Sequence, residues 1–439
     1  SIRVRATDAA GEFVEQAFIV SVEDVADGLS VVSVTPSSSG IKIEFSEALD
    51  TSELNVLSTP GFSGGSDIQL LGSATGFVKG SLVVSSDLQT VDFVATNGMA
   101  EDTYTLIVSS GVNGFKAQSG ALLDGNADGV TGDNYLSFID LTTAPQAVVG
   151  IESFARAPGE QASASLETNG VLNLNVETTE TVSSIDFTLS FNPELLDIEA
   201  VNLGDEAPAG ATVTYSVVAP GEIAVQFRSS TPLQAGVADF IAIDATVVAE
   251  AAYGEVGLLE VKNVNVNAGS VTSGGKSGVQ VVAKLGDANG DANHSTMDSI
   301  LAANLATRPN RGLASYPLID PLVVTDVSGS GQNTMFDSAL IATAERVEDV
   351  MGPTVERSVD SEKPRIILYR QDGEYGSVTL PRLQGAMAAR ASAFIEYSLG
   401  RNPQVQALFA SYGADMESSD DDNDNKNWFP DPGMINSGS

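Results

Sequence analysis

The chain has 439 residues, which is too many for one hydrophobic core and predicts about three to four domains. Its formal net charge is −37, because 58 acidic residues face only 21 lysines and arginines. Such a surface should reject nucleic acid and anionic membranes and attract divalent cations; the alternative is that the acidity only maintains solubility. The lack of cysteine excludes disulfides and thiolate chemistry, and no apolar run reaches membrane-spanning length.

Residues 1–28 predict two strands, IRVRA and FVEQAFIVSV, on either side of the turn TDAAGE. A lone hairpin is only marginally stable in water, so these strands need more sheet than the segment supplies. The stretch resembles the last two strands of a cadherin-like repeat, and the resemblance implies that Asp8 and Asp24 are calcium ligands. Two interpretations stay open: the rest of that domain lies upstream, or the strands complete a sheet of a neighbouring subunit.

Residues 29–143 show the pattern of a β-sandwich. Ile41, Ile43 and Phe45 alternate with Lys42 and Glu44, as in a half-buried strand, and similar short strands follow between turns rich in Gly, Ser and Asn. The segment VVSVTPSSSGIKIEFSEALDTSELN resembles the bacterial Ig-like domain of S-layer and other surface proteins.

Residues 147–283 are again rich in predicted strands. Leu172, Leu174 and Val176 alternate with asparagines, and the same period of two runs through IDFTLSF. SSIDFTLSFNPELLDIEAVNLG contains a strand, a turn at Asn192-Pro193 and an apolar run, and it resembles a cohesin signature. The resemblance implies a second β-sandwich with a cohesin-like fold.

Residues 284–350 contain two loops that place oxygen-bearing side chains at regular intervals. Calcium is bound in twelve-residue loops through positions 1, 3, 5, 7 and 12. The first loop has these residues at those positions: Asp287, Asn289, Asp291, Asn293 and Asp298. Magnesium fits less well because it prefers a rigid octahedron with several waters. The spacing therefore predicts a calcium site whose last ligand also begins a helix.

The second loop repeats this spacing with fewer carboxylates. Its residues at the five positions are Asp326, Ser328, Ser330, Gln332 and Asp337, which predicts a weaker calcium site. A helical apolar pattern follows each loop, through Met297, Ile300, Leu301 and Leu305 and through Phe336, Leu340, Ala344 and Val347. The alternative is a pair of acidic helix caps without metal.

The two loop–helix repeats resemble a dockerin module. The resemblance implies two calcium ions and a cohesin-recognition surface at positions 10 and 11, which are Thr296, Met297, Met335 and Phe336. Two features depart from the family. The link RPNRGLASYPLIDPLVVT is longer than usual, and the glycine usual at position 6 is Ala292 in the first loop, although Gly331 keeps it in the second.

A third acidic cluster lies in LLDGNADGVTGDN, inside the Ig-like segment. Asp124, Asn126, Asp128 and Asp133 predict a further calcium site that closes this domain. No helical pattern follows, and the alternative is a turn in which Asx side chains bind their own backbone.

Residues 351–439 resemble no family. They predict a hairpin in RIILYRQDGEYGSVTL, then two helices, then the solvated acidic tail SSDDDNDNKN.

The sequence argues against catalysis. Its one histidine, His294, lies inside the first acidic loop, so a Ser-His-Asp triad is not expected. Zinc ligands and a phosphate-binding Gly-Lys-Ser/Thr loop are also lacking. Composition alone does not exclude a carboxylate-pair glycosidase, but the aromatic residues on which sugars stack are scarce, and the one tryptophan is Trp428 in the tail. We interpret the chain as a non-enzyme.

The predicted fold class is mostly β. Tandem Ig-like and cohesin-like sandwiches are followed by a small α-helical dockerin-like calcium-binding module and an α+β C-terminal segment. The predicted function is that of a calcium-stabilised structural protein of the bacterial cell surface, in a layer, sheath or filament. Cohesin–dockerin-like and strand-addition contacts would make it a homo-oligomer or polymer. The alternative is an adhesin or scaffold that captures a dockerin-bearing partner or a glycan. Whether the cohesin-like and dockerin-like segments pair within one molecule or between molecules stays open.

Overall fold

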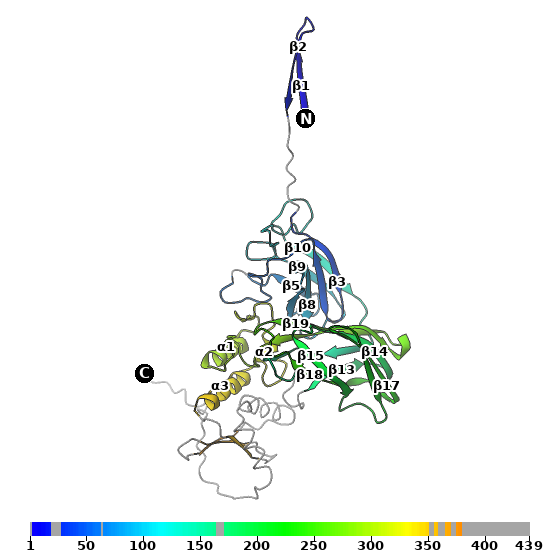
Figure 1. Cartoon of the computed structure of the whole chain (residues 1–439), viewed down its shortest axis with the longest axis vertical. Helices are drawn as coiled ribbons and strands as arrows, with labels where there is room; N and C mark the ends of the chain where they lie inside the picture. The colour runs from blue at the N-terminus through cyan, green and yellow to red at the C-terminus, as the bar shows by residue number, and fades with distance from the viewer. Residues whose placement is uncertain are drawn as a thin grey trace, which may run out of the picture.

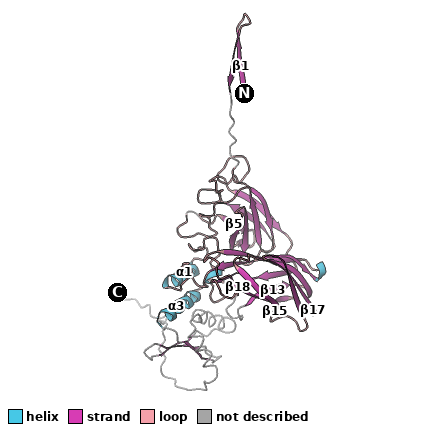
Figure 2. Cartoon of the chain, in the orientation of Figure 1, coloured by secondary structure: helices cyan, strands magenta, loops and turns pink. Residues whose placement is uncertain are grey.

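The computed structural model describes residues 2–18, 28–62, 65–163, 171–350, 355–358, 365–369 and 375–379. Over these residues the chain is mostly β, as predicted, and its α-helices α1 to α3 lie in residues 296–350 (Figure 1, Figure 2). None of the described helices combines the length and apolar character needed to cross a membrane.

The N-terminal hairpin is formed as predicted. Strands β1 (Ile2–Thr7) and β2 (Phe13–Phe18) pair antiparallel around a tight turn. Asp8 accepts hydrogen bonds from the backbone N–H groups of Ala10 and Glu12, both at 2.9 Å, so its carboxylate shapes the turn. Asp24 lies outside the described residues.

The first sandwich packs two four-stranded antiparallel sheets face to face. One sheet has the order β3 (Val31–Pro36), β4 (Gly40–Phe45), β8 (Thr90–Ala95), β7 (Gly80–Val84). The other has the order β10 (Tyr135–Leu141), β9 (Asp102–Val108), β5 (Ile68–Gly72), β6 (Gly76–Phe77). Ile41, Ile43 and Phe45 all face the core, which confirms the predicted alternation.

The second sandwich packs a five-stranded sheet on a six-stranded sheet. The first has the order β15 (Leu196–Leu203), β18 (Gly236–Val247), β13 (Val171–Thr178), β11 (Ala147–Ile151), β20 (Ser273–Lys276). The second has the order β12 (Phe154–Arg156), β21 (Gly278–Val282), β19 (Val256–Val266), β14 (Val182–Ser190), β17 (Glu222–Leu233), β16 (Thr212–Ala219), and a 3-10 turn at Asn267–Gly269 follows β19. Leu172, Leu174 and Val176 point into the core between the sheets.

Residues 284–350, the loop–helix module, carry the helices α1 (Thr296–Thr307), α2 (Leu322–Thr325) and α3 (Met335–Val350). The sequence predicts α1 and α3 but not the short α2. The module lies beside both sandwiches (Figure 1).

A third hydrophobic core joins the module to both sandwiches. Val83 and Val94 of the first sandwich and Val279 and Val281 of the second belong to one buried cluster with apolar residues of the module. Strand β21 is buried along its whole length, because one side faces the core of its own sandwich and the other faces the module. The module is therefore packed into the chain, and burial of this apolar surface stabilises the arrangement.

The two sandwiches also contact each other directly. The Ser39 hydroxyl donates to the carbonyl of Gly275 at 2.8 Å and accepts from the backbone N–H of Ser277 at 2.7 Å. Lys42 of β4 lies between Asp92, at 3.6 Å, and Glu260 of β19, at 3.4 Å.

In the C-terminal segment the structure describes one antiparallel sheet, β22 (Val355–Ser358), β23 (Arg365–Tyr369) and β24 (Tyr375–Thr379). The pair β23–β24 is the predicted hairpin, and β22 adds a strand that was not predicted. The two predicted helices and the acidic tail lie outside the described residues.

A buried carboxylate should make the stability of the first sandwich depend on pH. Asp67 accepts hydrogen bonds from the backbone N–H and side-chain amide of Asn55, and burial raises its pKa from 3.8 to about 6. Since the folded form binds the proton more tightly, its contribution to stability falls as pH rises through about 4 to 6. We expect the Asp67→Asn variant to gain stability relative to the wild type between pH 4 and pH 7, measured by urea unfolding. Parallel pH curves would contradict this assignment, and Asp205→Asn, at an exposed site, is the control.

Candidate metal centre

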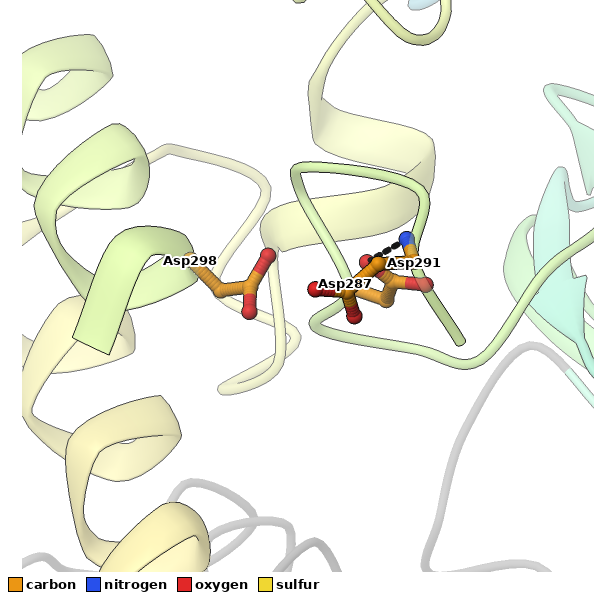
Figure 3. Close-up of side chains that lie close together, drawn as sticks. All are labelled: Asp287, Asp291 and Asp298. Atoms are coloured by element: carbon orange, nitrogen blue, oxygen red, sulfur yellow. Dashed lines mark hydrogen bonds between the residues drawn. The ribbon is translucent and has the colours of Figure 1, made fainter. Parts of the chain in front are cut away.

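The first acidic loop brings three carboxylates together. Asp287, Asp291 and Asp298 each offer an oxygen, and these atoms all lie within 4.8 Å of one another. Figure 3 shows Asp298 pointing from the start of α1 toward the two aspartates of the loop. Asp287 and Asp298 are fully buried, and Asp291 is exposed. The cluster has the hard oxygen chemistry that calcium prefers.

Backbone N–H groups hold the loop in shape. Asp287 accepts hydrogen bonds from the N–H of Gly290 at 2.7 Å, of Ala292 at 2.7 Å and of Asp291 at 3.2 Å. Asp298 accepts from the N–H of Asn289 and of Ser295, both at 2.8 Å, and forms a capping box with Ser295 at the start of α1. The twelfth loop position therefore lies in the first turn of the helix, as predicted, where its carboxylate completes the capping box.

The second loop repeats this hydrogen-bond pattern. Asp337 accepts from the N–H of Ser328 at 2.9 Å and of Thr334 at 2.8 Å, as Asp298 does from Asn289 and Ser295. Asp326 accepts from the N–H of Ser330 at 2.9 Å and of Gly331 at 2.6 Å, as Asp287 does from Asp291 and Ala292. Each of these residues follows its first-loop counterpart by 39 positions, since 326 − 287 and 337 − 298 are both 39. The two loops are thus structural repeats.

The other residues predicted at ligand positions differ in where they lie. The side chains of Asn289 and Asp291 meet, since the amide of Asn289 donates to the Asp291 carboxylate at 2.9 Å, and Asn293 is exposed at the rim. In the second loop, Ser328 is buried with its hydroxyl 3.2 Å from Asp326, whereas Ser330 and Gln332 are exposed.

Electrostatic repulsion makes both clusters costly without a cation. Burial raises the pKa of Asp298, and the negative charge of Asp287 raises it further. In the second loop, burial and the charge of Asp337 raise the pKa of Asp326. A divalent ion between these oxygens would reverse this effect, because its charge favours the ionised carboxylates.

Two tyrosines at the first loop were missed by the sequence analysis. The hydroxyl of Tyr253, from the connection between β18 and β19, donates to the Asp287 carboxylate and accepts from the N–H of Lys284 at 2.8 Å. Tyr316 is 3% exposed, and its hydroxyl lies near that of Tyr253. Burial and the charge of Asp287 raise the pKa of both hydroxyl groups, so both are protonated donors at neutral pH.

The residues predicted to recognise a partner lie mainly at the surface. Met297 is 53% exposed and Met335 59% exposed, and Thr296 is exposed beside them, whereas Phe336 is half-buried against the third core. Ile300, one turn along α1 from Met297, is 49% exposed. The N-terminal ends of α1 and α3 therefore present apolar side chains to solvent.

The third acidic cluster repeats part of the hydrogen-bond pattern of the first loop. Asp124 accepts from the N–H of Asp128 at 3.2 Å and of Gly129 at 2.9 Å, and Asn126 accepts from the N–H of Asp128, as Asp287 and Asn289 do from Asp291 and Ala292. Among the described residues, the carboxylates of Asp124, Asp128 and Asp133 do not form a close group of three. Such bonds also occur in an Asx-rich turn, so the calcium site here stays a prediction.

His294 is buried, and its Nε2 lies 2.8 Å from the carbonyl oxygen of Leu285. The ring thus packs under the first loop as a structural element.

Comparison with known proteins identifies the second sandwich. Residues 157–289 match the family model of the cohesin domain, which confirms the predicted cohesin-like segment. Cohesin domains are non-catalytic modules that bind dockerin partners. A search of curated proteins finds no match.

Three solved structures illustrate the similarity. A non-cellulosomal cohesin from Archaeoglobus fulgidus is 17% identical, with a TM-score of 0.26, and the match covers 31% of this chain and 90% of that chain. The seventh ScaB type I cohesin from Pseudobacteroides cellulosolvens is 18% identical, with a TM-score of 0.26 and coverage of 31% and 92%. A type I cohesin–dockerin complex from Clostridium thermocellum gives 13% identity, a TM-score of 0.27 and coverage of 34% and 99%.

Position 6 of the two loops offers a reciprocal test of loop geometry. Ala292 and Gly331 both have left-handed backbones, with φ of 67° and 75°. A side chain is disfavoured there, so Ala292→Gly should stabilise the module, and Gly331→Ala should destabilise it, each by about 0.5–1 kcal/mol. A Cβ on Gly331 would meet no atom within 4 Å, so crowding does not confuse the result. Urea unfolding measures both, and equal signs for the two substitutions would refute the shared geometry.

Proposed function

We propose that the chain is a calcium-stabilised, non-enzymatic assembly protein of the bacterial cell surface. It combines a cohesin domain with a dockerin-like module, and residues 29–143 form an Ig-like domain that packs against both. The observation that carries this proposal is the repeated loop of the module, which places Asp287 and Asp298, and again Asp326 and Asp337, in equivalent hydrogen-bond networks. Two such loops beside a cohesin domain in one chain favour assembly through protein–protein contacts.

The proposed domains are residues 1–28, 29–143, 147–283, 284–350 and 351–439. Three of these segments contribute to the third core. This shared core supports a rigid central unit rather than domains that move independently. The N-terminal hairpin exposes Val4, Phe13 and Val14, which supports its pairing with further sheet.

The surface of the module supports contacts between molecules. Ala302, Leu305 and Ile341 are buried in the third core, whereas Met297, Ile300 and Met335 stay exposed. The module thus uses one side to join its own chain and exposes three apolar side chains on another. Recognition of the cohesin domain of another copy would make a head-to-tail contact, and such a contact propagates a polymer unless it closes into a ring.

Calcium binding tests the metal part of this proposal. Isothermal titration calorimetry should detect two calcium ions per module, with the first loop binding more tightly because it has three carboxylates. Asp298→Asn should remove the first event and Asp337→Asn the second, each with at least a tenfold loss of affinity. Hydrogen exchange should show that chelator exposes α1 and α3 before the sandwiches, because ion binding stabilises only the folded loops.

Retention of full calcium affinity in both variants would contradict calcium binding at these loops. Hydrogen-exchange rates in α1 and α3 that do not change when chelator is added would contradict it as well. Asp205→Asn, on the exposed surface of the second sandwich, is the matched control.

Self-assembly tests the recognition surface. Sedimentation velocity in calcium should show ordered multimers of the full chain that dissociate in chelator. The double variant Met297→Asp, Met335→Asp should weaken assembly at least tenfold, since a buried unpaired carboxylate is costly at an apolar contact. Val112→Asp, at a site 68% exposed on the first sandwich, should assemble like the wild type. Normal assembly of the double variant would rule out this surface.

A further inference from the structure

The long link between the two loops fastens the module to the first sandwich. Its backbone forms three hydrogen bonds with one loop and one strand of that sandwich: Gly312 N–H to Ser58 O at 2.9 Å, Val56 N–H to Pro317 O at 3.0 Å, and Leu82 N–H to Leu318 O at 2.7 Å. Asp320 adds an N–H bond to the Ser81 hydroxyl at 2.9 Å and accepts from the Thr96 hydroxyl at 2.5 Å. We refer to residues 308–321 as the connector.

The same connector returns onto the first acidic loop. The hydroxyl of Ser315 donates to the carbonyl oxygen of Asn289, so the connector contacts the loop backbone directly. The next residue, Tyr316, is 3% exposed, and a Cβ on Gly290 would come within 3.6 Å of its hydroxyl, so this hydroxyl lies at the loop. Burial and the charge of Asp287 raise the pKa of this hydroxyl, which also interacts with the hydroxyl of Tyr253.

The second sandwich contacts the same loop through Tyr253. The hydroxyl of Tyr253 donates to Asp287 and accepts from the N–H of Lys284, so one side chain connects the sandwich to both the start and the first ligand position of the loop. The first loop therefore contacts both a residue of the cohesin domain and a connector bound to the other sandwich.

We propose that an ion in the first loop clamps the two sandwiches together, with Tyr253 and Tyr316 as the positioning residues that transmit its occupancy. The proposal rests on the function proposed above, in which this loop binds calcium. Asp287 and Asp298 would hold the ion, and their fixed carboxylates would in turn fix the tyrosine hydroxyls. Without an ion these carboxylates would repel one another, the loop would spread, and the connector and Tyr253 would lose their common anchor.

The second loop provides an internal contrast. Asp326 and Asp337 accept their hydrogen bonds from residues 328–334, inside their own loop. Asp326, Gly329 and Gly331 line one pocket with residues of both sandwiches, but these hydrogen bonds of the carboxylates reach neither sandwich. An ion there should order α3 and affect the distance between the sandwiches less than an ion in the first loop does.

The cysteine-free sequence allows a direct measurement of the junction. Spin labels at Val112→Cys on the first sandwich and Val218→Cys on the second occupy sites that are 68% and 61% exposed. In the full chain with calcium, pulsed electron spin resonance should give a narrow distance distribution. Chelator should broaden it at least twofold. The Asp326→Asn, Asp337→Asn background should keep the calcium-dependent narrowing, whereas Asp298→Asn should lose it.

Calorimetry of tyrosine variants tests the positioning role. Tyr253→Phe and Tyr316→Phe remove only a hydroxyl, and each should weaken calcium binding at the first loop about tenfold, as is usual for outer-shell partners of a metal. Each should also broaden the distribution of distances between the two spin labels at calcium concentrations that saturate the wild type. The matched control is Tyr104→Phe, which removes a buried hydroxyl bonded to the carbonyl of Ala100 at 2.8 Å. Its thermal stability should fall while its calcium affinity stays unchanged.

The outcomes separate the two proposals. If calcium binds but the distance distribution stays equally narrow in chelator, the clamp is overturned and the calcium site stands. Unchanged affinity in both tyrosine variants overturns their positioning role. If calorimetry of the wild type detects no calcium binding, the calcium site and the clamp both fail.

Discussion

Repulsion between buried carboxylates is the constraint on which the organisation of this chain depends. Asp287 and Asp298 are fully buried, and their charges oppose each other across a loop that also forms the start of α1. Backbone N–H groups and the helix N-terminus offset part of this repulsion. A divalent ion would offset the remainder, and the geometry of the loop is consistent with that role. Because the loop lies where three segments meet, the repulsion between its carboxylates affects the stability of the whole central unit.

The third core explains why a small module can have this influence. A module of one short and two longer helices has little apolar surface of its own, and it shares its core with Val83 and Val94 of one sandwich and Val279 and Val281 of the other. Each partner thus stabilises the others through this shared core, and each sandwich also has a core of its own. Ser39 adds two hydrogen bonds to the same junction, one with Gly275 and one with Ser277.

Local patterns predicted the elements, whereas their docking required the structure. The period of two at Ile41, Ile43 and Phe45 predicted a half-buried strand, and the calcium-loop spacing predicted where α1 and α3 begin. Tyr253 and Tyr316 lie far from Asp287 in sequence and outside any motif spacing, so only the tertiary fold brings them to the loop. Met297 and Ile300 share the helical spacing of Leu305 but stay exposed, because the third core covers a different side of α1.

In the proposed assembly, long-range charge repulsion and short-range apolar contact would oppose each other. With a net charge of −37, two copies repel at long range, so association needs a surface where short-range attraction exceeds that repulsion. The exposed Met297, Ile300 and Met335 supply apolar area, and Met is a side chain that adapts to varied partner surfaces. They stand at the start of the two helices that the acidic loops initiate. Metal binding in the loops would therefore order the recognition residues while lowering the local negative charge, and both effects favour association at the same place.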